Sequence, residues 1–253
     1  MIGIFDSGSG GLSVAREIVK ILPREKYVFF ADNAHCPYGE KSKEYIEDRA
    51  RAITDFLIGK GAGIVVVACN TATAAAIATL RKEYAPMKFI GMEPAVKPAA
   101  LGTKTGVIGV LATAGTLKGS KYLTTKSSVD SGIKIVEHVG KGFVELVERG
   151  VLEGPEAEET VRASLSPLLE AGADTIVLGC THYPFLINPI RKIAGEGVSI
   201  VDPAPAVARH LRNVMDEEGL IKNDGAPCGG PDIELVSSGD PESLQRIFSL
   251  IYL

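Results

Sequence analysis

The chain has 253 residues, which is enough for one large domain or for two domains of ordinary size. Hydrophobic residues make up 45% and charged residues 23%, the balance of a soluble globular protein. The formal net charge is −4, so there is no basic excess to neutralise a phosphate backbone. We therefore do not expect nucleic acid as a main partner.

The sequence carries no sign of export or of membrane insertion. Residues 1–6 have the pattern of a strand, without the cationic region and apolar stretch of a signal peptide. No apolar run approaches the roughly 20 residues that span a bilayer. We therefore expect a cytoplasmic protein with no membrane partner, whose cysteines are free thiols. The four are Cys36, Cys69, Cys180 and Cys228. None forms a C-x-x-C pair, so no metal site is expected.

Strand-like and helical patterns alternate through the first 95 residues. Continuous apolar runs predict strands at residues 2–5, 27–31, 63–68 and 89–91. Apolar residues at helical spacing predict helices at residues 11–22, 42–60 and 73–84. This alternation is typical of an α/β domain whose parallel sheet is covered by helices on both faces.

The same alternation then restarts. Strands are predicted at residues 105–111, 134–138, 175–178 and 199–202, and helices at residues 116–126, 142–149, 155–171 and 184–194. The opening run I-G-I-F-D-S at 2–7 resembles I-G-V-L-A-T at 108–113. We therefore predict an α/β fold of two similar three-layer domains with mainly parallel sheets, related by a pseudo-twofold axis, with the active site in the cleft between them.

Two proline-containing segments predict where the chain crosses between the halves, at residues 93–98 and 202–205. Helical patterns at 206–218 and 241–250 follow the second crossover and are expected to pack on the first half. The predicted domains are residues 1–95 with 207–253, and residues 96–206. The stretch 222–231 is expected to be a surface loop.

Two of the cysteines have matching settings in the two halves. Cys69 ends the run I-V-V-V-A-C, Cys180 ends the run T-I-V-L-G-C, and a hydroxyl-bearing turn follows each. Ligands of open α/β sheets bind at the carboxyl ends of the strands. A thiol at the start of a helix also has its pKa lowered toward the thiolate. We therefore predict that both thiols face one substrate from opposite sides.

Two thiols on opposite sides of a substrate suit the inversion of a carbon stereocentre. One thiolate removes a proton from one face, and one thiol returns a proton to the other. No lysine lies in a recognisable cofactor motif, so pyridoxal phosphate is not expected. Hydrogen-bond donors must then stabilise the carbanion. The candidates are Ser7, Asn70, Thr71, Thr113, Thr116 and Thr181.

The glycine-rich segment D-S-G-S-G-G at residues 6–11 follows the first predicted strand. Its glycines allow backbone N–H groups to approach an anion at the start of a helix. No lysine follows it, as a phosphate loop requires, and the third glycine of a dinucleotide motif is missing. Two interpretations stay open: a site for a small anion such as a carboxylate, or a purely structural turn. Asp6 suits an ammonium group or a neighbouring base.

Polar residues follow the second predicted strand and the second thiol. Tyr38 and Gly39 are expected to close over a small ligand, unless residues 31–39 form an ordinary polar loop. His182 lies two positions after Cys180, where it acts as an acid, orients the thiol or binds the substrate.

Four motifs in order resemble those of the glutamate racemases: F-D-S-G-S-G-G-L at 5–12, P-Y-G at 37–39, A-C-N-T-A-T at 68–73 and L-G-C-T-H-Y-P at 178–184. Residues 93–94 and 115–116 match as well. The resemblance implies cofactor-independent interconversion of L- and D-glutamate, the D-enantiomer being a building block of bacterial peptidoglycan. It also implies two α/β domains with the site between them, and a homodimer.

The resemblance further implies a role for each residue. Cys69 and Cys180 are the acid/base pair, with Cys69 acting on D-glutamate and Cys180 on L-glutamate. Asp6 and His182 assist them. The substrate contacts are Asp6, Ser7, Tyr38, Gly39, Asn70, Thr71, Thr181 and His182. Glu148 matches an assisting glutamate in a segment like F-V-P-L-V-E, although Glu145 replaces its proline. Gly140-Lys141 and Asp202-Pro203 also depart from the family pattern.

Three alternatives stay open on the sequence. In the first, the protein is a racemase whose substrate is aspartate or another amino acid. In the second, it is a thiol hydrolase that uses one cysteine as its nucleophile, which predicts a covalent acyl-enzyme. In the third, it binds a carboxylate and performs no proton transfer.

Overall fold

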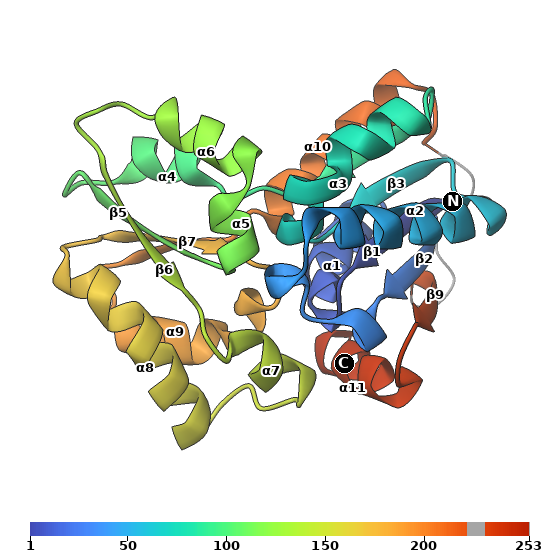
Figure 1. The fold of residues 1–253 in the computed structure, drawn as a ribbon. Helices are drawn as coiled ribbons and strands as arrows, with labels where there is room; N and C mark the ends of the chain where they lie inside the picture. Colours follow the sequence, from blue (N-terminus) through green and yellow to red (C-terminus); the bar gives the residue numbers. More distant parts are fainter. Residues whose placement is uncertain (222–230, 253) are drawn as a thin grey trace.

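Two parallel β-sheets organise the chain in the computed structural model, which describes residues 1–221 and 231–252 (Figure 1). Each sheet is flanked by helices, which confirms the α/β class expected from the alternating patterns. The predicted surface loop at 222–231 lies outside the described residues, apart from Pro231, and so does Cys228.

The first sheet, called here the β1 sheet, has the strand order β4-β3-β1-β2-β9. Its strands are β1 (Ile2–Asp6), β2 (Lys26–Ala31), β3 (Ile64–Val67), β4 (Lys88–Gly91) and β9 (Asp232–Ser237). The parallel register sets Phe5 beside Val67 and Asp6 beside Ala31. The loops after β1, β2 and β3 therefore leave the sheet at the same edge.

Helices cover both faces of the β1 sheet. One face packs against α1 (Leu12–Ile21), α10 (Ala204–Glu217) and α11 (Pro241–Tyr252), and the other against α2 (Lys43–Gly59) and α3 (Asn70–Glu83). Side chains alternate along β1, so that Ile2 and Ile4 enter the first core and Phe5 enters the second. Burial on both faces explains the continuous apolar runs of the strands.

The second sheet, called here the β5 sheet, has the order β6-β5-β7-β8. Its strands are β5 (Val107–Ala112), β6 (Lys134–Val139), β7 (Thr175–Gly179) and β8 (Ser199–Val201). One face packs against α7 (Phe143–Glu148), α8 (Pro155–Glu170) and α9 (Ile187–Ala194), and the other against α4 (Val96–Gly102) and α6 (Ser120–Ser127).

The two sheets repeat one topology. The order β8-β7-β5-β6 corresponds strand for strand to β4-β3-β1-β2, so β5 matches β1 and β7 matches β3. The internal repeat predicted from residues 2–7 and 108–113 is therefore confirmed. Cys69 follows β3 and Cys180 follows β7, which gives the two thiols equivalent places at the ends of equivalent strands.

Several predicted elements were wrong in detail. The helix predicted at 116–126 is divided by the extended backbone of Gly119 into α5 (Ala114–Lys118) and α6. A side chain at Gly119 would lie 2.7 Å from the Cβ of Ala74, so glycine lets α6 approach α3. The predicted crossover overlaps the start of helix α4. Strand β9 was not predicted, because charged residues interrupt the apolar ones in its half-buried run D-I-E-L-V-S.

Two helices begin at other residues than the sequence predicted. Helix α3 begins at Asn70 rather than Thr73, because the Cys69 sulfur caps it. A 3₁₀ turn, η4 (Tyr183–Leu186), precedes α9, which begins only at Ile187. Within residues 1–221 and 231–252, no helix is both long and apolar enough to cross a bilayer.

Replacing Leu211 by Ala tests the packing of α10 on the β1 sheet. Leu211 lies on α10 and is fully buried in the core that this helix shares with α1 and the β1 sheet, so Leu211→Ala is expected to lower the free energy of unfolding by about 2–5 kcal/mol. Leu250→Ala on α11 is the matched control, because 56% of that side chain is exposed. Urea denaturation measures both, and equal losses in the two variants would contradict the packing.

Candidate active site

One cavity lies between the carboxyl edges of the two sheets and contains both thiols. Its lining residues are Ser7, Pro37, Tyr38, Gly39, Cys69, Asn70, Thr71, Thr113, Val144, Cys180, Thr181 and His182. The β1 sheet and the β5 sheet both contribute to this wall. The structure thus brings most of the predicted site residues together, including the two thiols of the internal repeat.

Cys69 lies between the end of β3 and the start of α3. Its sulfur accepts a hydrogen bond from the N–H of Ala72 at 3.4 Å, and its thiol donates to Ser7 Oγ at 3.5 Å. Burial raises the pKa of Cys69, and the negative charge of Asp6 raises it further; the bonds with Ser7 and Ala72 lower it only in part. The sequence had predicted a lowered pKa for a thiol at a helix start, and for Cys69 the opposite holds. Cys69 is therefore a protonated thiol.

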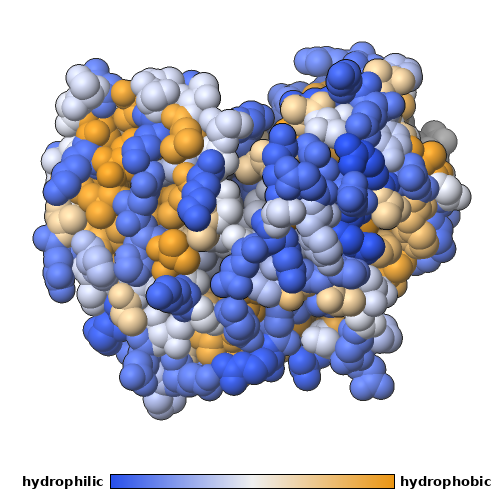
Figure 2. All heavy atoms as spheres, viewed as in Figure 1, coloured by the Kyte–Doolittle hydropathy of each residue, from blue (hydrophilic) through white to orange (hydrophobic). Residues whose placement is uncertain are grey.

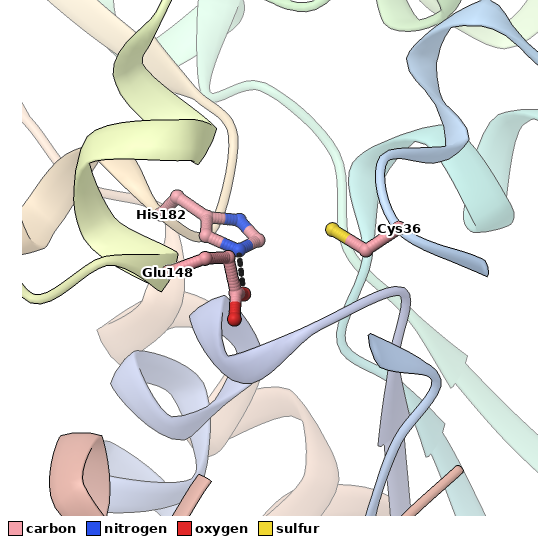
Figure 3. A group of neighbouring side chains, drawn as sticks. All are labelled: Cys36, Glu148 and His182. Carbon is pink, nitrogen blue, oxygen red and sulfur yellow. Dashed lines mark hydrogen bonds and ion pairs between the residues drawn. The ribbon is translucent and has the colours of Figure 1, made fainter. Parts of the chain in front are cut away.

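Cys180 has a different partner. Its sulfur lies 3.7 Å from His182 Nδ1. On the other side of the ring, His182 Nε2 lies 2.7 Å from Glu148 Oε1, as Figure 3 shows. Burial disfavours the charged imidazole, but the hydrogen bonds to Cys180 and Glu148 outweigh it and raise the pKa of His182 well above its usual value. An imidazolium that faces Cys180 supplies the positive charge that a thiolate at this position needs.

Glu148 is held in its ionised form. Burial alone would raise the pKa of Glu148, but hydrogen bonds from His182 and Ser9 lower it below 4.5, the usual value. Glu148 and the buried His182 thus form a partly buried ion pair. The sequence motif had marked Glu148 as an assisting residue, and the structure places its carboxylate against His182.

The glycine-rich segment after β1 binds carboxylates of the protein itself. Gly11 N–H donates to Asp6 Oδ2 at 2.9 Å and Gly8 N–H at 3.3 Å, while Ser9 N–H donates to Glu148 Oε1 at 2.7 Å. These contacts favour the structural interpretation of the two that the sequence left open. The segment does hold carboxylates at the start of a helix, but these are the side chains of Asp6 and Glu148.

Asp6 is completely buried beside both halves of the cavity wall. Thr181 Oγ1 lies 3.4 Å from each of its carboxylate oxygens. Burial raises the pKa of Asp6, and the charge of His182 and the Gly11 N–H oppose this. Because Asp6 acts electrostatically on Cys69 while His182 contacts Cys180, the two thiols have environments of opposite charge.

Asn70 has an unused hydrogen-bonding group in the cavity wall. Asn70 is 3% exposed, and among the described residues neither its amide nitrogen nor its amide oxygen has a hydrogen-bond partner. A buried amide without partners costs free energy, so such groups mark places where a ligand completes the hydrogen bonding. Asn70 is thus the clearest sign that a polar ligand belongs in this cavity.

Three threonine hydroxyls meet beside Asn70 and join the two sheets. Thr71 Oγ1 lies 2.9 Å from Thr113 Oγ1 and 3.3 Å from Thr116 Oγ1, and the latter two lie 3.0 Å apart. Thr71 and Thr113 line the cavity, whereas Thr116 lies behind them. The structure therefore places Thr116, predicted as a substrate contact, in support of the other two.

Tyr38 is fixed by residues that sequence reasoning missed. Its hydroxyl donates to Asp32 Oδ2 at 2.5 Å, and Arg49 binds both Asp32 oxygens at 2.8 and 2.9 Å. Asp32 follows β2 in the segment 31–39, which the sequence had left open as a ligand loop. Arg49 lies on α2, and no motif in the sequence marked it as part of the site. Gly39 contributes its backbone to the cavity beside Tyr38.

Cys36, Glu148 and His182 form a group whose potential metal-ligand atoms all lie within 4.8 Å of one another. Figure 3 shows the Cys36 sulfur turned toward the other two from the opposite side. Both oxygens of Glu148, however, already accept hydrogen bonds, and His182 Nε2 lies on one of them. A metal would have to displace these contacts, so we interpret Glu148 and His182 as hydrogen-bonding partners rather than as metal ligands.

Comparisons with known proteins agree with this arrangement. A family model described as "Asp/Glu/Hydantoin racemase" matches residues 2–211. The chain belongs to this racemase family. A glutamate racemase from Roseiflexus sp. (strain RS-1) is 47% identical over 97% of this chain and 90% of its own length. One from Methylococcus capsulatus is 48% identical, over 99% and 91%.

Solved structures extend the racemase family likeness to the fold. A glutamate racemase from Bacillus anthracis has a TM-score of 0.87 at 33% identity, with 98% of this chain and 91% of that chain covered. A glutamate racemase from Escherichia coli, solved with L-glutamate and an activator, has a TM-score of 0.86 at 31% identity, with 100% and 95% covered. The expected fold, two α/β units around one site, is confirmed.

The ion pair of Glu148 predicts a defined pH dependence of stability. Because the folded-state pKa of Glu148 lies below 4.5, its stabilising contribution is complete above about pH 5 and is lost as the pH falls through the folded-state value. The unfolding free energies of wild type and Glu148→Gln should therefore differ most between about pH 5 and 6.5, where both partners of the ion pair contribute fully, and converge as the pH falls through the folded-state pKa of Glu148. Urea titrations across this range measure the difference.

The matched control is Glu145→Gln, an exposed glutamate on the same helix. Its difference from wild type should stay small and nearly constant across the same pH range. If the difference in unfolding free energy between wild type and Glu148→Gln grows as the pH falls, ionised Glu148 does not stabilise the fold.

Proposed function

We propose that this protein interconverts L- and D-glutamate by proton transfer between two cysteines, without a cofactor. The observation that carries the proposal is the placement of Cys69 and Cys180 at the ends of equivalent strands, on the wall of one cavity. The substrate class is supported by relatives that are named glutamate racemases and that match this chain over nearly its whole length.

The reaction follows from the different environments of the two thiols. The Cys180 thiolate, beside the His182 imidazolium, takes the α-proton of L-glutamate. The Cys69 thiol then gives its proton to the opposite face of the carbanion, which yields D-glutamate. After turnover, Cys180 is the thiol and Cys69 the thiolate. The same steps in reverse convert D-glutamate, so the assisting groups are His182 with Glu148 on one side and Asp6 on the other.

The carbanion requires stabilisation by fixed hydrogen-bond donors at the substrate carboxylate. Asn70 supplies an unpartnered buried amide, and the hydroxyls of Thr71 and Thr181 line the same cavity. Ser7, Thr113 and the backbone at Tyr38 and Gly39 complete the proposed substrate contacts, with Thr116 behind them. The buried carboxylate of Asp6 suits the substrate ammonium group.

We propose the domains that the sequence predicted, residues 1–95 with 207–253 and residues 96–206. The β1 sheet draws its strands from both ends of the chain, and the β5 sheet from the middle, which supports this division. The reaction would provide D-glutamate for bacterial peptidoglycan in the cytoplasm, and thereby support cell shape.

The resemblance to glutamate racemases also leads us to propose a homodimer. Figure 2 shows apolar side chains gathered over α4 and α6, on the half of the molecule that holds the β5 sheet. Leu101 on α4 is 91% exposed and Leu123 on α6 is 48% exposed. Contiguous apolar surface of this kind favours association. Sedimentation velocity distinguishes the dimer from a monomer.

Removing either thiol of the proposed pair should abolish racemisation. Cys69→Ala and Cys180→Ala are each expected to lower kcat by about 10²- to 10⁴-fold in both directions, because each turnover uses both groups. Circular dichroism of glutamate solutions follows the reaction. Cys36→Ala is the control: this cysteine does not line the cavity and should leave most of the activity.

A thiol hydrolase would give a different result with the same variants. One cysteine would be dispensable, and the other would form a covalent acyl-enzyme that mass spectrometry detects. Near-normal racemisation by either single variant would exclude the two-cysteine mechanism.

The preference for glutamate over aspartate is a separate test. The two substrates differ by one methylene, which a fitted pocket discriminates by about 10- to 200-fold in kcat/KM. We expect glutamate to be preferred within this range. Racemisation assays with both amino acids measure the ratio, and a preference for aspartate would replace the proposed substrate while leaving the mechanism in place.

A further inference from the structure

Glu148 is bound by residues of the opposite half of the molecule. Its Oε1 accepts hydrogen bonds from His182 Nε2 and from Ser9 N–H, both at 2.7 Å. Its Oε2 accepts one from Asn33 Nδ2 at 2.8 Å and one from Ser9 Oγ at 3.1 Å. Asn33 and Ser9 follow strands of the β1 sheet. Glu148 ends α7, which packs on the β5 sheet, and His182 follows β7 of that sheet.

The amide of Asn33 is itself held in one orientation. Its Oδ1 accepts a hydrogen bond from Ser237 Oγ at 3.2 Å, and its Nδ2 donates to Glu148 Oε2 at 2.8 Å and to Ser9 Oγ at 3.2 Å. Ser237 is the last residue of β9, the strand of the β1 sheet that has no counterpart in the β5 sheet. The reversed amide would set two oxygens against each other at Glu148. A continuous series of contacts thus runs from β9 through Asn33, Glu148 and His182 to Cys180.

We propose that Asn33 is a positioning residue for the Cys180 side of the reaction, holding Glu148 so that its carboxylate keeps the His182 imidazolium against the thiol. This proposal rests on the proposed function. Asn33 does not line the catalytic cavity, so it acts through Glu148 and has no contact with substrate.

The chemistry of an amide suits this position. A neutral N–H donor stabilises the carboxylate without a second positive charge that would compete with His182 for it. Deleting the amide leaves Oε2 with Ser9 Oγ alone and frees the carboxylate to rotate away from His182. The loss should therefore appear in the chemical step, and substrate binding should change little.

The first test is a double-variant cycle in kcat between Asn33→Ala and Glu148→Gln. Asn33→Ala is expected to lower kcat by about tenfold or more, the size of a hydrogen bond to a charged group, while KM changes less than about threefold. In the Glu148→Gln background, Asn33→Ala should change kcat less than about twofold, because the carboxylate it positions is already gone. Additive effects would overturn the proposal.

The control for this cycle is Asn188→Ala. Asn188 Nδ2 donates to Glu153 Oε1 at 2.6 Å, the same pair of groups on the exposed surface. This variant should leave kcat within about twofold of wild type. If Asn33→Ala behaves like Asn188→Ala, Asn33 has no positioning role. If the wild type itself does not racemise glutamate, the proposed function fails instead.

A second variant keeps the proposal testable if Asn33→Ala does not fold. Asn33→Asp has the same shape but sets a second carboxylate against Glu148, so kcat should fall by more than about tenfold. In the Glu148→Gln background, Asn33→Asp should change kcat less than about twofold, because the carboxylate that the new aspartate would repel is gone. An equal loss of kcat in both backgrounds would contradict the proposal.

Discussion

The arrangement of the site depends on the meeting of two equivalent strand ends across one cavity. β3 and β7 hold the same place in two sheets of the same topology, and each ends in a cysteine. Inverting a stereocentre needs groups on opposite faces of one carbon, and a repeated α/β unit with its strand ends turned inward supplies two such groups. Loops, caps and helices then serve to hold the two thiols and to distinguish them.

The distinction between the thiols is electrostatic. Cys69 lies near the buried carboxyl of Asp6, which raises its pKa, and Cys180 faces an imidazolium held by Glu148. A negative charge thus lies near one thiol and a positive charge near the other, an asymmetry that suits a reaction with one proton donor and one proton acceptor. The carboxylates that create this difference are themselves bound by N–H groups of the glycine-rich segment after β1.

Local sequence patterns predicted the parts of the site that are local. Val/Ile runs and the repeat located both thiols at strand ends, and glycine spacing located the turn after β1. Long-range pairings left no such pattern in the sequence. Ser9 and Glu148 are 139 positions apart, so the sequence did not predict that the glycine-rich segment binds the Glu148 carboxylate. Arg49 likewise reaches Asp32 from a helix, and β9 joins the β1 sheet from the far end of the chain. The family motif did identify Glu148, but its partners Asn33 and Ser9 emerged only from the fold.

In the two-cysteine mechanism, two different groups exchange protons with the two faces of one carbon. To test this, the reaction is started from each enantiomer of glutamate in deuterated water, and the α-position is followed by NMR and mass spectrometry during the first turnovers. The mechanism predicts that the newly formed enantiomer carries deuterium while the remaining starting enantiomer keeps its hydrogen. Deuterium entering the starting enantiomer as fast as the product would indicate a single base. No exchange at all would show that the protein only binds its ligand.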